Sequence, residues 1–249
     1  MPVEKPTIIF LHGFPFNHTM WDEQARLCEP RFQVMNHDLR GHGRGELGGG
    51  QYLFEFFVDD LLHLMDTQNI DKAILCGLSM GGYIALRMTE RHSDRIQGLI
   101  LCDTRSEADS DQAKLNRAAD FRLIQKEGLP AFADRFLKKA LAPSTCIKNP
   151  ALAATVKQMI TLNSITGVQG VLIALATRTD TTAALATFQV PTLILVGAED
   201  PITPPAAAAA LQSQIAGSRM AIIPEAAHLS NLENPQAFNV QFLDFLKQF

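Results

Sequence analysis

The sequence is poor in several features that would mark out whole classes of protein. Its 249 residues contain only four cysteines, Cys28, Cys76, Cys102 and Cys146, and no two of them form a CxxC pair. We therefore expect neither a disulfide framework nor a zinc site. Cys76 and Cys102 lie within apolar runs, where a thiol packs as a small hydrophobic group.

A large excess of charge and a long apolar segment are missing as well. The formal net charge is −4, and no basic cluster offers a footprint for nucleic acid. No apolar run is long enough to span a bilayer, and the first residues lack the apolar core and the small-residue cleavage site of a signal peptide. We expect a soluble, cytoplasmic protein that binds neither nucleic acid nor a membrane.

Apolar residues, in contrast, are plentiful, at 47% of a chain whose length suits one main α/β domain. Short apolar runs alternate with helical stretches along the chain. The runs are residues 7–13, 32–39, 73–79, 96–104, 192–200 and 219–227. Most are nearly continuous in apolar residues, which is typical of strands buried on both faces of a parallel sheet. This alternation predicts an α/β fold.

The stretches between these runs predict helices. Residues 52–69 carry apolar side chains at helical spacing, namely Leu53, Phe56, Phe57, Leu61, Leu64 and Met65. Thr203 before Pro204 and Pro205 is predicted to cap the helix that follows. Residues 105–190 break the alternation, because they predict several helices and no strand. We expect this segment to be an insertion that covers one end of the sheet.

The stretch GLSMGG at 77–82 follows an apolar run and precedes a helical one. A G-x-S-x-G sequence in this context forces a tight turn from strand to helix, for which the glycines at 77 and 81 leave room. Such a turn presents Ser79 at the carboxyl ends of the strands, beside a helix N-terminus that favours negative charge. Ser79 is therefore a candidate nucleophile. The alternative is a glycine-rich turn with an incidental serine.

A serine hydroxyl needs a base and an acid to act as a nucleophile. His228 follows the last predicted strand and Asp200 ends the strand before it, so that the order along the chain is serine, aspartate, histidine. Glu199 is a rival for the acid. Asp103 also ends a strand and is a further alternative, although an aspartate there can simply bind loop amides.

Taken together, five segments resemble the α/β-hydrolase superfamily. They are HGFP at 12–15, DLRGHG at 38–43, GLSMGG at 77–82, GAEDPITP at 197–204 and AAHLSNLENP at 226–235. Within the superfamily the chain is most similar to the small esterases grouped with 3-oxoadipate enol-lactonases and cofactor-free haloperoxidases. Two features differ: Ala227 stands where the family often has glycine, and few residues precede Thr7, where the family often begins with a hairpin.

The resemblance implies an α/β-hydrolase fold. We expect a mostly or wholly parallel sheet of about six strands flanked by helices. Residues 1–104 and 191–249 would form the hydrolase core, and residues 105–190 would form a helical cap, or lid.

The resemblance also implies roles for individual residues. Ser79 would be the nucleophile, His228 the general base and then acid, and Asp200 the group that orients the imidazole. The oxyanion hole would consist of the backbone N–H groups of Met80 and Phe14. His12, which precedes Phe14 in HGFP, is expected to shape that loop.

Substrate contacts are predicted from apolar residues near these motifs. Phe16, Trp21 and Leu229 are candidates for the pocket, with core packing as the alternative. Four arginines in the insertion could recognise a substrate carboxylate, although solvated helix faces are more common. They are Arg105, Arg117, Arg122 and Arg178.

We therefore predict a serine hydrolase of carboxylesterase or lactonase type that cleaves a small-molecule ester or lactone without metal or organic cofactor. GRGELG at 43–48 matches a dinucleotide fingerprint, but three glycines, Gly48 to Gly50, stand where its helix should already run, so a mobile loop is favoured. Enol-lactonase and perhydrolase activities are alternatives within the enzyme class. A small-molecule sensor with the same fold is an alternative of another class.

Overall fold

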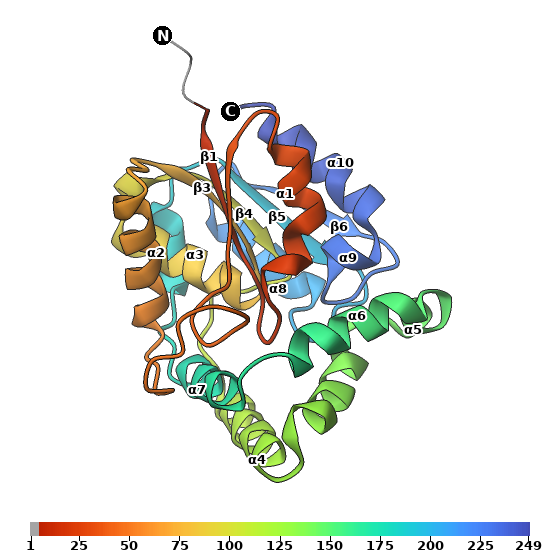
Figure 1. The fold of residues 1–249 in the computed structure, drawn as a ribbon. Helices are drawn as coiled ribbons and strands as arrows, with labels where there is room; N and C mark the ends of the chain where they lie inside the picture. The colour runs from red at the N-terminus through yellow and green to blue at the C-terminus, as the bar shows by residue number, and fades with distance from the viewer. Residues whose placement is uncertain (1–4) are drawn as a thin grey trace.

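The computed structural model describes residues 5–249 and contains one six-stranded sheet of order β2-β1-β3-β4-β5-β6 (Figure 1). All five neighbouring pairs are parallel, which confirms the predicted sheet. The strands are β1 (Thr7–Leu11), β2 (Gln33–Asn36), β3 (Ala73–Leu78), β4 (Ile96–Cys102), β5 (Thr192–Gly197) and β6 (Arg219–Ile223). The expectation that no hairpin precedes β1 concerns mainly residues 1–4, which lie outside the described residues.

Helices cover both faces of this sheet, so that its central strands are buried (Figure 1). One face carries α1 (Asp22–Cys28) and α10 (Pro235–Leu246). The other carries α2 (Glu55–Thr67), α3 (Met80–Arg91) and α8 (Pro205–Gln214). Every residue of β1, β3 and β5 is buried, whereas the edge strands β2 and β6 are partly exposed. The nearly continuous apolar sequences of the central strands therefore match their positions.

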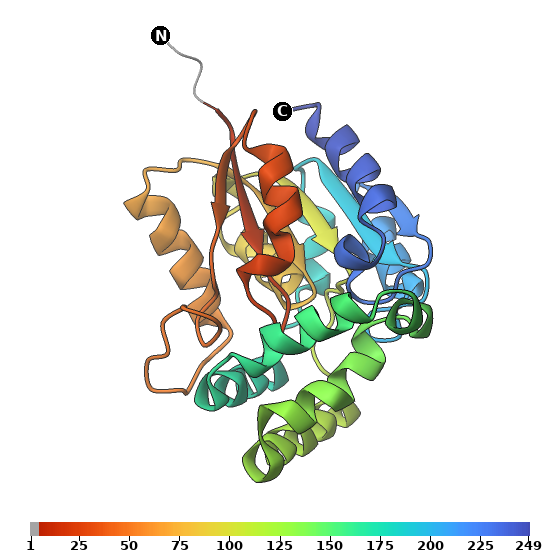
Figure 2. The same ribbon diagram turned by 45° about the vertical axis from the view of Figure 1, so that its right-hand side comes forward.

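Helices also fill the segment between β4 and β5, and we call residues 105–190 the cap segment. Its helices are α4 (Asp111–Ala140), α5 (Pro143–Lys148), α6 (Pro150–Thr161), α7 (Ile165–Ala176) and the 3₁₀ helix η3 (Thr182–Thr187). Of these, α4 to α7 lie beyond the carboxyl ends of the strands (Figure 2). α4 consists of two helices that meet at Gly128, where φ is 78° and ψ is 178°, two residues before Pro130. Glycine suits this break because other residues rarely adopt such a positive φ.

Two details of the predicted helices are wrong. The helix expected over residues 52–69 spans only α2, so that Leu53 precedes it and is 57% exposed, and Phe56 lies on its outer side at 36% exposure. Thr203 does not cap α8, because Pro204 takes that position and the Thr203 side chain instead contacts Asp200. In both cases a tertiary arrangement overrides the local pattern.

No single helix among residues 5–249 is long and apolar enough to cross a membrane. α6 and α7 pass that test only when they are taken together, by length and composition alone, and a bend of 91° separates them.

Candidate active site

Ser79 lies at the sharp turn between β3 and α3, with a φ of 53° and a ψ of −111°. This strained backbone persists because its surroundings fix it: the Ser79 N–H donates to the Cys102 carbonyl at 2.9 Å, and Thr104 Oγ1 donates to the Ser79 carbonyl at 2.8 Å. A side chain on Gly77 would overlap the Gly81 carbonyl, and one on Gly81 would overlap the main chain of β1. The turn therefore requires both glycines of the G-x-S-x-G sequence.

His228 and Asp200 form a buried pair beside the carboxyl ends of β5 and β6. His228 Nδ1 lies 2.7 Å from Asp200 Oδ2. A carboxylate only accepts hydrogen bonds, so Nδ1 carries the proton and Nε2 is left with a free lone pair. Asp200 is further held by the N–H groups of Ile202, at 2.7 Å, and Thr203, at 3.1 Å, both of which donate to Oδ1. The imidazole orientation is thus set by a carboxylate that is itself fixed.

The pKa values of this pair move in opposite directions. Burial alone would lower the pKa of His228, but the Asp200 charge and hydrogen bond outweigh it and raise that pKa above its ordinary value. Burial would likewise raise the pKa of Asp200, but His228 and the hydrogen bonds from Thr203 hold it below its ordinary value. The aspartate therefore stays ionised and makes the histidine a stronger base.

The two rival acids occupy different environments. Glu199 is exposed, whereas Asp103 is fully buried. Asp103 accepts the Gly197 N–H at 2.8 Å, and its Oδ2 lies 2.5 Å from Ser230 Oγ. Burial, followed by the nearby Asp200 charge, raises the pKa of Asp103 to about 8. Of the three acids that the sequence left open, Asp200 is the one hydrogen-bonded to the histidine.

Thr203 is one residue near this pair whose role the sequence analysis missed. Its hydroxyl donates to Asp200 Oδ2 at 2.7 Å and lies 3.3 Å from His228 Nδ1. Its place three residues after Asp200 was a usable signal, because the hydroxyl and the carboxylate belong to one short loop.

Glu233 is the second residue near this pair whose role was not predicted from the sequence. Its carboxylate accepts the N–H groups of Ala227 and Leu229, on either side of His228, at 2.9 and 3.3 Å. It also accepts the Ala142 N–H and the Thr145 hydroxyl of the cap segment, each at 2.7 Å. It therefore joins the histidine loop to the cap segment. No local pattern reveals this, because the cap partners lie about ninety residues away in sequence.

The expected oxyanion donors occupy suitable elements. Met80 is the first residue of α3, and Phe14 follows β1 in the HGFP loop. The His12 ring ties this loop to the β2–α2 connection, because its Nε2 accepts the Leu39 N–H at 2.9 Å while its Nδ1 donates to the Gly13 carbonyl at 3.0 Å. Burial lowers the pKa of His12 to about 4, so the ring stays neutral and keeps both hydrogen bonds. The loop-shaping role expected for His12 agrees with these contacts.

The predicted substrate contacts divide into two groups. Phe16 is buried against Phe136 of the cap segment, with ring centroids 5.9 Å apart. Leu229 is buried directly after His228. Trp21 instead packs in the core between Phe10 of β1, at 5.4 Å, and Phe238 of α10, at 6.2 Å. The alternative of core packing therefore describes Trp21.

The four arginines of the insertion are not part of the hydrogen-bond network around His228 and Asp200. Arg178 is buried in an ion pair with Asp109, and its guanidinium lies 4.3 Å from the Tyr83 ring centroid. Arg117 Nε donates to the same aspartate at 2.9 Å. Within residues 5–249, no hydrogen bond joins Arg105, Arg117, Arg122 or Arg178 to Ser79, Asp200 or His228.

The glycines at 43, 45 and 48 lie in the loop between β2 and α2, and the next helix begins only at Glu55. A dinucleotide fingerprint requires a helix that starts at the glycines, so this part of the chain lacks that geometry. Residues 5–249 also contain no group of three or more His, Cys, Asp or Glu side chains placed to hold a metal ion.

Comparison with known proteins agrees with this geometry. The family described as alpha/beta hydrolase fold matches residues 6–235. The chain is 28% identical to 3-oxoadipate enol-lactonase 2 of Acinetobacter baylyi over 99% of its own length and 90% of that protein. It is similar in structure to a thermophilic esterase from Thermogutta terrifontis, with a TM-score of 0.94, 34% identity, and coverage of 98% of this chain and 90% of the esterase. For the enol-lactonase from Burkholderia xenovorans the TM-score is 0.91 and the identity 31%, with 98% and 92% of the two chains covered.

These matches cover nearly the whole chain and include esterases and enol-lactonases, as the resemblance of the five motifs predicted. The parallel sheet, the turn at Ser79 and the relatives lead to one conclusion. The chain belongs to the α/β-hydrolase fold family and is an enzyme of that family.

Proposed function

We propose that this enzyme is a serine hydrolase that cleaves a small carboxylic ester or lactone through an acyl-enzyme intermediate. The observation that carries the proposal is the buried pair of His228 and Asp200, in which Nδ1 lies 2.7 Å from Oδ2. The same chain holds Ser79 on a strained strand-to-helix turn. A proton acceptor with a fixed tautomer is what a serine hydroxyl needs in order to attack a carbonyl.

In the proposed reaction, Ser79 Oγ attacks the substrate carbonyl carbon while His228 Nε2 accepts the hydroxyl proton. The carbonyl oxygen becomes an oxyanion, which the N–H groups of Met80 and Phe14 stabilise. His228 then gives the proton to the leaving alcohol oxygen as the carbon–oxygen bond breaks. A water molecule attacks the acyl-enzyme by the same route in reverse, and the carboxylic acid is released. With a lactone, the alcohol and the acid belong to one product.

We further propose that the cap segment forms the lid of this site and sets the size of the acyl or alcohol group. Ser79 is 7% exposed and His228 is 1% exposed, so other residues cover most of both. Phe14 and Phe16 of the HGFP loop both meet the ring of Phe136 from α4, at 6.2 and 5.9 Å. This aromatic contact is apolar, which favours short uncharged acyl groups over charged ones.

A panel of esters and lactones with varied acyl length tests the proposal. Ser79→Ala should lower turnover by several orders of magnitude without loss of folding, whereas the exposed Ser213→Ala should leave it unchanged. A fluorophosphonate should label the wild type at Ser79. Retained activity in Ser79→Ala would refute the mechanism, and a single burst of product without steady turnover would indicate a sensor with the hydrolase fold instead.

A further inference from the structure

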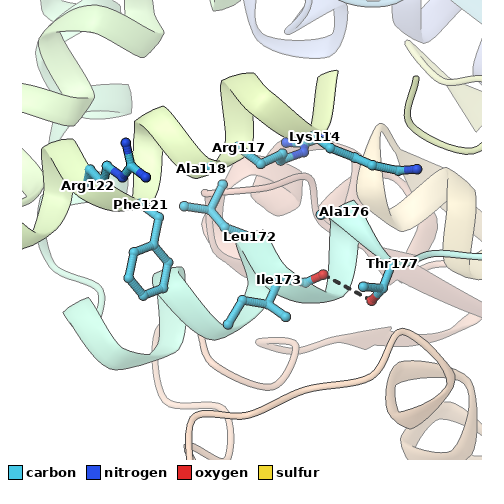
Figure 3. Close-up of a pocket in the computed structure, with 9 residues that line it drawn as sticks. All are labelled: Lys114, Arg117, Ala118, Phe121, Arg122, Leu172, Ile173, Ala176 and Thr177. Carbon is cyan, nitrogen blue, oxygen red and sulfur yellow. Dashed lines mark hydrogen bonds between the residues drawn. The ribbon is translucent and has the colours of Figure 1, made fainter. Parts of the chain in front are cut away.

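A groove of about 280 Å³ lies between α4 and α7 on the cap segment (Figure 3). Apolar side chains of both helices form its floor, among them Phe121 of α4 and Leu172 and Ile173 of α7. Figure 3 shows the Phe121 ring directed toward α7. Ile173 is 44% exposed, so this floor is open to solvent. A concave apolar surface of this size suits part of a small molecule better than a protein helix.

The edge of the groove is positively charged. Lys114, Arg117 and Arg122 line it, and none of its lining residues is acidic. Arg117 is engaged by Asp109, and Lys114 lies 3.4 Å from Asp111, a carboxylate that is itself fully exposed. Arg122 makes no ion pair and no side-chain hydrogen bond with any other residue of 5–249. Positive charge beside an apolar floor is the complement of an amphiphilic anion.

We propose that this groove binds a medium-chain aliphatic monocarboxylate. The alkyl chain lies along Phe121, Leu172 and Ile173, and the carboxylate pairs with Arg122. A guanidinium presents parallel N–H groups that match the two oxygens of a carboxylate. Lys114, two helical turns away on α4, adds attraction at longer range.

The position of the groove gives such binding a consequence for the rest of the chain. α7 is bound to α4 where the Gln169 amide donates to the Phe121 carbonyl at 3.2 Å, and α4 ends at Ala140, whose carbonyl accepts the His228 N–H at 3.1 Å. A ligand that contacts α4 and α7 together stabilises the packing of α7 against the first half of α4. Any effect on the histidine loop passes through the break at Gly128, which separates this half from Ala140. The inference goes beyond the proposed function, because neither the groove nor its ligand requires Ser79 to react.

Titration of the protein with octanoate tests the inference. Calorimetry measures the affinity, and the methyl chemical shifts of Leu172 and Ile173 show whether octanoate binds in the groove. We expect saturable binding that moves both methyl signals and raises the melting temperature. Arg122→Gln should weaken binding about fivefold, the upper range for one exposed ion pair, and Lys114→Gln about twofold. Ala118→Trp, which fills the groove from an exposed position of α4, should weaken it at least tenfold.

Control variants and control ligands distinguish binding in the groove from binding elsewhere on the chain. Lys126→Gln removes an exposed cation of the same helix outside the groove and should leave the affinity unchanged. Octanol, which lacks the charge, and butyrate, which lacks the long tail, should each bind at least tenfold more weakly than octanoate. The inference is overturned if octanol binds with the same affinity as octanoate. It is also overturned if Ala118→Trp, with an unchanged melting temperature, binds octanoate as tightly as the wild type does. A third contrary result would be an Ile173 signal that moves on dilution alone, since that result assigns the groove to a second copy of the chain.

Discussion

Replacing Asp103 by asparagine should change the pH dependence of stability while leaving the pair of His228 and Asp200 in place. Asparagine has nearly the same shape, so that its oxygen can accept the Gly197 N–H and its amide can donate to Ser230 Oγ. The substitution removes only the ability of the side chain to ionise. Because burial and the Asp200 charge raise the pKa of Asp103 to about 8, the wild-type carboxyl is protonated in the folded protein at neutral pH.

The size of the effect follows from the two pKa values. In the unfolded chain Asp103 titrates near its ordinary value of 3.8, so between that pH and about 8 only the folded state holds the proton. The favourable contribution of the protonated carboxyl is complete below pH 3.8 and declines as the pH rises, until the folded pKa has been passed. Each pH unit in this window corresponds to about 1.4 kcal/mol. The asparagine variant lacks this loss.

The measurement is urea unfolding of both proteins between pH 4 and pH 9. The free energy of unfolding of Asp103→Asn, relative to wild type, should increase by about 3 kcal/mol between pH 5 and pH 7 and level off above pH 8. Its esterase activity near pH 7 should stay within a few-fold of wild type, whereas Asp200→Asn should lower kcat about 10⁴-fold. A stability difference that does not change with pH would refute the reasoning, because it would mean that Asp103 is ionised in the folded state.

Three further predictions concern the base, the oxyanion hole and the cap segment. Because His228 must be neutral to accept a proton and its pKa is raised, kcat/KM should fall as the pH decreases, with a midpoint above 6.5, and a profile flat from pH 5 to pH 8 would contradict this. Phe14→Ala keeps the backbone N–H and should alter mainly substrate preference, whereas Phe14→Pro removes it and should lower kcat about 100-fold to 1,000-fold; equal kinetics at equal melting temperature would exclude Phe14 as a donor. Glu233→Ala leaves four donors without their acceptor and should destabilise the protein by about 2 to 4 kcal/mol in urea unfolding, and Glu233→Gln by less; an unchanged stability would show that the contacts to Ala142 and Thr145 contribute nothing.

The predicted fold needed only local information about the chain. Continuous apolar runs such as 73–79 and 192–200 identified buried parallel strands, because a strand covered on both faces has no polar side. Residues 105–190 were predicted to be helical because they contain several helical stretches in succession and no convincing strand between them, even though one of those stretches, residues 171–176, is a continuous apolar run. Boundaries were less accurate, since helix ends depend on neighbours: the sequence does not show that Leu53 lies outside α2 or that Thr203 binds Asp200 in place of capping α8.

The sequence by itself determined the position of the candidate nucleophile and the order of its partners. The glycines around Ser79 are a steric requirement of one turn, so a short local pattern reveals them. Only the tertiary structure decided among the acids. Glu199 and Asp200 are adjacent in sequence, yet one is exposed and the other is bonded to His228. Both follow the end of β5, where the N–H groups of Ile202 and Thr203 hold only the Asp200 carboxylate, against the histidine.

The tertiary structure also decided which groups are charged and which only pack. Asp103 and Asp200 are the same residue type at the ends of neighbouring strands, but hydrogen bonds from His228 and Thr203 keep the pKa of Asp200 low, while burial raises that of Asp103 to about 8. Trp21 lies near the HGFP motif in sequence and in the core in space. Burial and the sign of neighbouring charges are properties of the folded chain, because they depend on residues that are distant in sequence and meet only when the sheet and the cap segment are assembled.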